Sequence, residues 1–153
     1  MRVSVVGGSD ADPETWDRAH ELGVRLAERD HTVVCGGLGG VMAAVCEGVA
    51  DAGGRSIGIL PGDRYDAANE FVDTAVATGL GHARNSLVVL NGDAVIAVAG
   101  SGGTLSEIGF SLVFDRPIAG LRTHDVEGVH QCETPVEAVN YVERAVEGAG
   151  RKS

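Results

Sequence analysis

The chain has 153 residues, a length typical of one domain, and 44% of them are hydrophobic, which is ordinary for a soluble globular protein. Its 22 acidic and 12 basic residues give a net charge of −10, which disfavours a general nucleic-acid-binding surface and an anionic membrane surface. Lys152 is the only lysine, and this acid-rich composition fits either a halophilic source or an ordinary protein made soluble by its acidity.

The sequence also narrows the compartment and the covalent chemistry. No apolar run approaches the ~20 residues of a transmembrane helix, and the start MRVSVVGGSD is typical of a strand and a turn rather than a signal peptide. We therefore expect a cytoplasmic protein with no membrane partner. Three cysteines without a C-x-x-C pair disfavour a disulfide framework and a structural zinc site.

Strand-length apolar runs alternate with amphipathic helical segments along the chain. In chain order, the pattern predicts a strand at 2–6, a helix at 15–28, a strand at 32–35, a helix at 41–52, strands at 56–60 and 74–77, a helix at 82–90, a strand at 94–98, a helix at 104–114, a strand at 117–121 and a helix at 134–147.

Local signals predict how several of these helices begin and end. Pro13 suits the first turn of the first helix, and Asn91-Gly92 is expected to end the third helix in a left-handed turn. Thr134, Pro135 and Glu137 predict a capped start for the last helix, with Glu137 completing a capping box. Residues 148–153 are expected to form a frayed tail.

Alternation of strands and helices with short connections predicts the fold class. Parallel strands need helical crossovers, and a sheet covered on both faces needs strands that are apolar throughout. We expect an α/β protein with a single domain over residues 1–153. Its predicted architecture is a Rossmann-like, doubly wound parallel sheet of about six to seven strands, with helices on both faces.

Three strand-to-helix turns are rich in glycine: VSVVGGS, TVVCGGLGG and VIAVAGSGGT. A bare backbone at a helix N-terminus presents N–H groups to an anion, usually a phosphate. Taken singly, each cluster is better explained as a tight turn that only glycine can form. Three of them at the carboxyl edge of one parallel sheet favour a phosphate- or nucleotide-binding site.

Two nucleotide-binding motifs are absent from the sequence. There is no G-x-x-x-x-G-K-[ST] phosphate loop, and G-x-G-x-x-G fails because Met42 and Leu105 occupy its last position. The second strand ends in Cys35-Gly36, without the acid that would bind a ribose 2′-hydroxyl. A mononucleotide or a similar phosphorylated ligand is therefore favoured over a dinucleotide redox cofactor.

Arg84 and Glu107 are the candidates for chemistry. Glu107 lies three residues after Thr104, where it either caps the helix as T-x-x-E or places a carboxylate beside a bound anion. Arg84, in the segment GHARN, is either a surface arginine or a guanidinium that binds a phosphate or sugar oxygen. Neighbouring parallel units can bring both side chains to one pocket.

Other candidates carry less chemistry. His124, His130 and Cys132 form a loose set within RTHDVEGVHQC, but no fourth ligand or helical spacing supports a metal site, and their role stays open. Trp16 and Met42 are interpreted as core or pocket-wall residues.

Two segments resemble the Lonely Guy family, also called lysine decarboxylase-like proteins. CGGLGGVM, residues 35–42, resembles its Gly-Gly-Gly-x-x-Gly-[Leu/Val]-Met segment. AGSGGTLSE, residues 99–107, resembles its P-G-G-x-G-T-x-x-E signature, with Ala99 replacing the proline and Ser101 the second glycine. The family's arginine is matched by Arg84, 107 − 84 = 23 positions before Glu107. The resemblance covers about residues 2–121 and is nearest to the small branch related to molybdenum-cofactor carriers and Smf-type DNA-processing domains.

The resemblance implies a phosphoribohydrolase that splits a nucleoside 5′-monophosphate into free base and ribose 5-phosphate, with Arg84 and Glu107 as catalytic residues. Such an enzyme needs no metal or redox cofactor. The resemblance also implies a homo-oligomer. The carrier branch leaves an alternative, a non-catalytic binding protein for a phosphorylated ligand such as a nucleotide or molybdenum cofactor. The implied phosphate-binding residues are Gly7, Gly8, Ser9, Gly100, Ser101, Gly102, Gly103 and Thr104, and the implied nucleotide-binding residues are Gly36, Gly37, Gly39, Gly40 and Met42.

Overall fold

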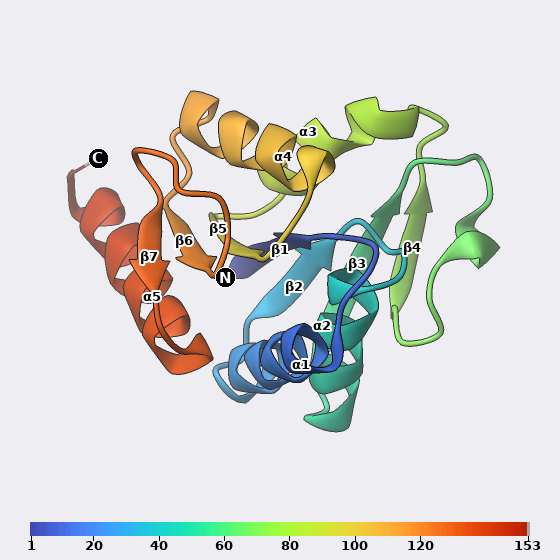
Figure 1. Cartoon of the computed structure of the whole chain (residues 1–153), viewed down its shortest axis with the longest axis horizontal. Helices are drawn as coiled ribbons and strands as arrows, with labels where there is room; N and C mark the ends of the chain where they lie inside the picture. The colour runs from blue at the N-terminus through green and yellow to red at the C-terminus, as the bar shows by residue number, and fades with distance from the viewer. Residues whose placement is uncertain (153) are drawn as a thin grey trace.

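The computed structural model describes the backbone of residues 1–152 and the side chains of residues 1–150. This part of the chain forms one seven-stranded parallel sheet in the order β4-β3-β2-β1-β5-β6-β7 (Figure 1). The strands are β1 (Arg2–Gly7), β2 (Thr32–Cys35), β3 (Arg55–Leu60), β4 (Thr74–Ala77), β5 (Ala94–Val98), β6 (Ile118–Leu121) and β7 (His130–Cys132).

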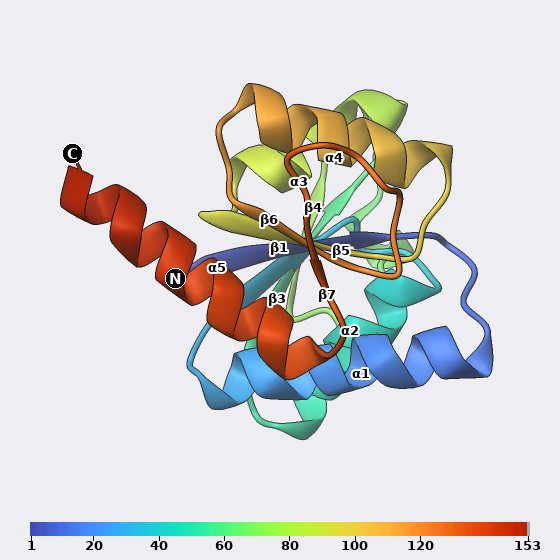
Figure 2. The same ribbon diagram turned by 60° about the vertical axis from the view of Figure 1, so that its left-hand side comes forward.

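Helices cover both faces of this sheet, as Figure 2 shows with the sheet seen nearly edge-on. Helices α1, α2 and α5 lie on one face, and α3 and α4 lie on the other. The predicted α/β, Rossmann-like architecture is therefore confirmed. The helices are α1 (Pro13–Glu28), α2 (Val41–Asp51), α3 (Arg84–Leu90), α4 (Gly102–Val113) and α5 (Pro135–Lys152), and the short 3-10 turns are η1 (Tyr65–Ala67) and η2 (Gly81–Ala83).

The sheet has a buried centre because its middle strands are apolar on both faces. All five residues of β5 are buried, and Val3, Val5 and Val6 of β1 are buried beside them. Strand β1 pairs with β2 on one side and β5 on the other, so the chain winds outward from β1 in both directions. In such sheets the loops at the carboxyl ends of the central strands diverge and leave a crevice for a ligand.

Helices α1 and α2 cross at unusually close range because each has a glycine at the crossing. A Cβ on Gly23 would lie 2.1 Å from the Val45 carbonyl oxygen, and a Cβ on Gly48 would lie 2.0 Å from the His20 carbonyl oxygen. Both obstacles are backbone atoms, so they cannot turn aside. The two glycines therefore fix how α2 sits on the sheet, and with it the loop that precedes α2.

We expect Gly48→Ala to lower the free energy of unfolding by about 1–3 kcal/mol, because overpacking forces the two helices apart. Gly109→Ala is the matched control: Gly109 lies on the exposed side of α4 with nothing near its Cβ position. That substitution should raise stability by about 0.5–1 kcal/mol through helix propensity. Urea unfolding of both variants measures the contrast, and equal effects at the two positions would contradict the close crossing.

Most predicted boundaries agree with the structure to within one or two residues, and Pro13 begins α1 behind the N-cap Asp12, which accepts from Thr15 N at 2.8 Å. The predicted left-handed end of α3 is wrong. Asn91 has φ −87°, and Gly92 is not among the glycines with positive φ. A Cβ on Gly92 would lie 2.1 Å from Ser4 Oγ, so this glycine is required by close packing rather than by its dihedral angles.

Three features near the C-terminus differ from the expected pattern. Strand β7 follows β6 in the sheet and was not predicted. Helix α5 continues to Lys152, past the expected end at residue 147, and Ser153 lies outside the described residues. Thr134 Oγ1 accepts from Glu137 N at 3.2 Å as predicted, but the Glu137 carboxylate accepts from Glu133 N at 2.8 Å, one residue before the expected donor.

No helix of the described chain has the length and apolar character needed to cross a bilayer.

Candidate functional site

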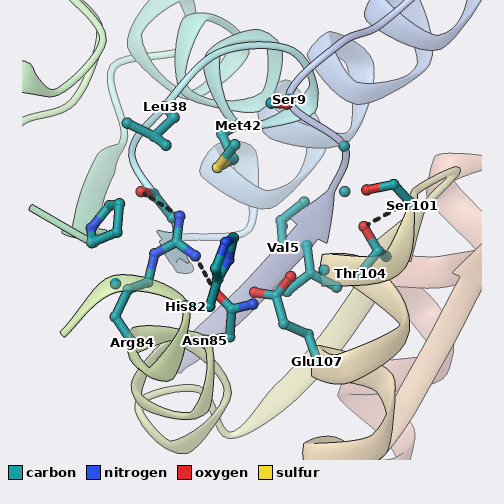
Figure 3. A pocket seen from close by; sticks show the side chains of 17 residues that line it. Val5, Ser9, Leu38, Met42, His82, Arg84, Asn85, Ser101, Thr104 and Glu107 are labelled. Carbon is teal, nitrogen blue, oxygen red and sulfur yellow. Dashed lines mark hydrogen bonds between the residues drawn. The ribbon is translucent and has the colours of Figure 1, made fainter.

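A cavity of about 320 Å³ lies at the carboxyl ends of the central strands (Figure 3). The loops after β1, β2 and β5 form its walls together with residues of α3 and α4. The cavity therefore occupies the crevice that the strand order predicts. Its lining residues are Val5, Val6, Gly7, Gly8, Ser9, Gly36, Leu38, Met42, Pro61, Gly81, His82, Arg84, Asn85, Ser101, Gly103, Thr104 and Glu107.

Arg84, the first residue of α3, is a buried arginine of this cavity. Its side chain donates from Nε to the Ile59 carbonyl at 2.9 Å and from Nη2 to the Gly36 carbonyl at 3.4 Å, and Nη1 donates to Asn85 Oδ1. Those two carbonyls lie at the carboxyl ends of β3 and β2. Arg84 is only 7% exposed, so the alternative of a surface arginine is wrong.

Gly36 makes room for this guanidinium. A Cβ at position 36 would lie 2.7 Å from Arg84 Nη2 and 2.7 Å from Met42 Sδ. Burial lowers the pKa of Arg84, and the nearby Glu107 acts in the opposite direction. The absence of a side chain at Gly36 therefore lets the Arg84 guanidinium enter the cavity between the end of β2 and the sulfur of Met42.

Glu107 faces the same cavity from α4, with its carboxylate directed inward (Figure 3). The residue is 7% exposed, and burial raises the pKa of its carboxyl group from 4.5 to about 7, against the opposing effect of Arg84. Among the described residues its carboxylate oxygens make no hydrogen bond, and Ser111 Oγ donates to its main-chain carbonyl instead. A carboxylate so placed is free to act on a ligand near neutral pH.

The capping interpretation of Glu107 is wrong because α4 begins earlier than the sequence suggests. The helix starts at Gly102 with Ser101 as its N-cap, and Ser101 N donates to Thr104 Oγ1 at 3.3 Å. Thr104 is thus inside the first turn, and Glu107 lies beyond it. The N–H groups of Gly102 and Gly103, in the first turn of α4, lack intrahelical acceptors and lie beside the cavity, which makes them available to an anion.

The SLOG cluster4 family model matches residues 1–147, nearly the whole chain. The chain belongs to the SLOG cluster4 family. It is 43% identical over 142 residues to an uncharacterized protein of Archaeoglobus fulgidus, covering 92% of this chain and 93% of that protein. It is 29% identical over 157 residues to the cytokinin riboside 5′-monophosphate phosphoribohydrolase LOG1 of Arabidopsis thaliana, covering 95% and 70%. The rice relative LOGL9, a probable enzyme of the same name, is 35% identical over 112 residues, and the match spans about half of its length, 49%.

Solved structures add a second group of relatives to this SLOG cluster4 chain. The molybdenum cofactor binding protein of Rippkaea orientalis superposes with a TM-score of 0.88 at 30% identity, covering 95% of this chain and 96% of that one. The molybdenum cofactor carrier protein of Chlamydomonas reinhardtii gives 0.83 at 28% identity, covering 94% and 96%. DNA processing protein A of Helicobacter pylori, at 0.71 and 17% identity over 95% and 81%, shows only the shared fold. The resemblance to the Lonely Guy superfamily and to its molybdenum-cofactor carrier branch is confirmed.

One departure of this SLOG cluster4 chain from the Lonely Guy signature has a structural counterpart. Ala99, which stands where the signature has proline, has φ +49°, and a proline ring holds φ near −65°. Gly100 follows with φ +121°, and a Cβ there would lie 2.5 Å from the Thr104 side chain. A proline could not form this loop.

The remaining glycines of the predicted site lie outside the cavity lining. Gly37 and Gly40 have positive φ, and a Cβ on Gly40 would lie 2.4 Å from the Gly8 carbonyl oxygen. Gly39 lies against the Ser9 carbonyl, and Gly100 and Gly102 precede or begin α4. These positions shape the loops that carry the lining residues. The predicted residues that do line the cavity are Gly7, Gly8, Ser9, Gly36, Met42, Arg84, Ser101, Gly103, Thr104 and Glu107.

Sequence reasoning missed several lining residues. Asn85 is 3% exposed, accepts from Arg84 and donates from Nδ2 to Ser106 Oγ at 3.2 Å, so it links α3 to α4. Leu38 and Pro61 add an apolar wall, and the exposed His82 lies at the cavity next to Arg84. Asn85 and His82 belong to the GHARN segment, so their closeness to Arg84 in sequence was the available signal.

The loose set of His124, His130 and Cys132 is not gathered into one site. His124 Nε2 contacts the Ser101 carbonyl at 3.0 Å, the His130 ring stacks on Tyr141, and Cys132 Sγ contacts the His130 carbonyl. Trp16 packs against the core, in line with its predicted role.

Proposed function

We propose that the protein is a phosphoribohydrolase that cleaves the N-glycosidic bond of a nucleoside 5′-monophosphate to free base and ribose 5-phosphate. The observation that carries the proposal is the buried Glu107 carboxylate, with a pKa of about 7, in one cavity with Arg84 and the three glycine-rich loops. The relatives named as cytokinin riboside 5′-monophosphate phosphoribohydrolases support it.

The glycine-rich loops would bind the phosphate. The loop with Gly7, Gly8 and Ser9 and the start of α4 meet at the cavity, where backbone N–H groups and a helix N-terminus favour negative charge. A protein of net charge −10 has to attract phosphate locally in this way. The apolar side chains of Leu38, Met42 and Pro61 would then contact the base.

Glu107 and Arg84 would act on the ribose. As the C1′–N bond breaks, positive charge develops on the ring, and the ionised Glu107 stabilises it and accepts a proton from the water that attacks C1′. The base leaves with the bond's electron pair and takes up a proton. Three of the five guanidinium N–H groups of Arg84 donate to Ile59, Gly36 and Asn85, which fixes the other two for a substrate oxygen.

The test is a panel of nucleoside 5′-monophosphates, assayed by chromatography for free base and ribose 5-phosphate. We expect release from at least one monophosphate, and an efficiency at least about 100-fold lower for the matching nucleoside, because several charge-assisted hydrogen bonds to phosphate are lost. Equal cleavage of nucleoside and monophosphate would contradict a phosphate-binding role for the loops. Binding of monophosphates without any base release would contradict the hydrolase.

A second candidate is a non-catalytic carrier of a phosphorylated ligand, such as a nucleotide or molybdenum cofactor. The molybdenum cofactor proteins favour it, because they match nearly the full length of both chains, whereas the LOG relatives are longer than this chain. In that case the same cavity would bind its ligand without turnover. Stoichiometric binding in the panel, with no base released, is the result expected of a carrier.

We also propose a homo-oligomeric, cytoplasmic protein whose partner is a small phosphorylated ligand rather than a nucleic acid or a membrane. The excess of acidic residues supports the exclusion of both polyanionic partners. Light scattering after gel filtration measures the oligomeric state, and a monomer at micromolar concentration would contradict that part of the proposal.

A further inference from the structure

The loop between β5 and α4, residues 99–103, must present N–H groups to a phosphate and keep its carbonyl groups away from it. Carbonyl oxygens carry partial negative charge, so a carbonyl turned toward the cavity would repel an anion. The directions of the loop's carbonyls therefore decide whether it binds phosphate at all.

Two side chains from the loop after β6 hold these carbonyls. Thr123 Oγ1 donates to the Ala99 carbonyl at 2.7 Å, and His124 Nε2 donates to the Ser101 carbonyl at 3.0 Å. Neither residue lines the cavity, so both carbonyls are bound from outside it. The Gly8 carbonyl in the facing loop is bound in the same manner, by Val41 N at 3.0 Å.

The Ala99 carbonyl depends most on this support. Ala99 and Gly100 have φ of +49° and +121°, which is a strained path for a non-glycine residue at position 99. The Ser101 carbonyl, by contrast, also accepts the first helical bond of α4, from Leu105 N at 3.0 Å. Loss of Thr123 would thus free one peptide to rotate, while loss of His124 would remove the second of two donors.

Peptide geometry converts the Thr123 bond into a direction for an N–H group. The described chain has no cis peptide bond, and in a planar trans peptide the carbonyl and the following N–H point in opposite directions. Thr123 binds the Ala99 carbonyl from the β6 side, so the Gly100 N–H is directed to the β1 side. There a Cβ on Gly8 would be 3.9 Å from Gly100 Cα, and Gly8 and Ser9 line the cavity.

Strand β7 supports the loop that carries Thr123 and His124. Gln131 Nε2 donates to the His124 carbonyl at 3.1 Å, and Gln131 pairs with Gly120 of β6. A Cβ on Gly120 would lie 2.7 Å from Thr123 Cγ2 and 2.8 Å from Gln131 Oε1, so the three residues are in close contact. The short edge strand therefore braces the loop that holds residues 99–103.

We infer that Thr123 and His124 are positioning residues for phosphate: they hold the Ala99 and Ser101 carbonyls outward so that the following N–H groups, those of Gly100 and Gly102, face the bound phosphate. The inference rests on the phosphate-binding part of the proposed function and not on hydrolysis. It assigns a role to the RTHDVEGVHQC segment.

The test compares affinities for ribose 5-phosphate, measured by calorimetry. Thr123→Val keeps the shape and removes the donor, and we expect it to weaken binding about tenfold. Thr123→Ser keeps the hydroxyl and should bind within about twofold of the unchanged chain. His124→Ala should weaken binding about two- to fivefold, because Leu105 N still binds the Ser101 carbonyl. His130→Ala, an exposed histidine in the same segment that stacks on Tyr141, is the matched control and should have no effect.

A purely structural role would produce a different pattern. If the Thr123→Val variant keeps its affinity, or if Thr123→Ser loses as much as Thr123→Val, the inference is overturned. With a substrate from the panel, Thr123→Val should raise KM and change kcat by less than about threefold, because the phosphate contacts persist in the transition state. If the unchanged chain binds ribose 5-phosphate but releases no base, the hydrolase is refuted and the affinities still decide the inference. If the unchanged chain does not bind ribose 5-phosphate, the phosphate-binding part of the proposed function and the inference on Thr123 and His124 both fail.

Discussion

Glu107→Gln is expected to lower the rate of base release by about 10²–10⁴-fold, the range found when a positioned acid or base is removed. The amide has nearly the same shape as the carboxyl group, so the cavity should keep its form. It carries no negative charge, so it cannot stabilise a positively charged ribose or accept a proton from water. The measurement is kcat for the best monophosphate of the panel, taken at pH 8, where most of the Glu107 carboxylate is ionised.

Two controls separate chemistry from binding in this experiment. Glu47→Gln changes a half-buried glutamate on α2 that lies beside His20, away from the cavity, and it should leave kcat unchanged. Glu107→Gln should still bind ribose 5-phosphate, because the loops rather than Glu107 are proposed to contact the phosphate. A variant that keeps kcat within about threefold would remove Glu107 from the reaction.

Much of this site could be predicted because the carboxyl ends of parallel strands meet at one edge. Three glycine clusters that follow three strands must converge there whatever the details of packing. Arg84 begins a helix that follows one strand, and Glu107 lies near the start of a helix that follows the next strand. Their convergence at the same edge of the sheet could therefore also be predicted from the sequence. The partners of Arg84 were not, since the carbonyls of Ile59 and Gly36 come near it only through the pairing of β2 with β3.

The errors came from local rules that packing overrides. The dipeptide Asn91-Gly92 is typical of a left-handed helix end. In the structure, however, Gly92 packs against Ser4, a residue far away in the sequence, and it needs no positive φ. At the start of α4, Ser101 begins an S-x-x-T pattern and Thr104 begins a T-x-x-E pattern. The sequence alone does not decide which of these two residues is the N-cap. Strand β7 has three residues and no apolar alternation, so its pairing with β6 is a purely tertiary feature.

The second large effect concerns stability as a function of pH. Glu107 has a pKa of about 7 in the folded chain and an ordinary value of 4.5 when solvated. Between these values the folded chain keeps a proton that the unfolded chain releases. The stabilising contribution of the protonated group is therefore complete below pH 4.5 and is lost as pH rises through 7, and it amounts to about 3 kcal/mol.

Glu107→Gln removes this titration and leaves the other groups of the chain in place. The free energy of unfolding of the variant, minus that of the unchanged chain, should therefore rise by about 3 kcal/mol between pH 4.5 and pH 8. Urea unfolding at both pH values and at one fixed salt concentration measures the difference. The fixed salt matters because a chain of net charge −10 also responds to screening.

This stability difference bears directly on the proposed reaction. The free energy that disfavours the ionised carboxylate comes from its burial beside an arginine that only partly offsets it. A positive charge developing on ribose would sit next to that carboxylate and recover part of the same free energy in the transition state. If the free energies of unfolding of the variant and of the unchanged chain differ by the same amount at pH 4.5 and at pH 8, Glu107 is not held in an unfavourable ionised state. The electrostatic basis for its catalytic role would then be lost, and the carrier would become the better account of the cavity.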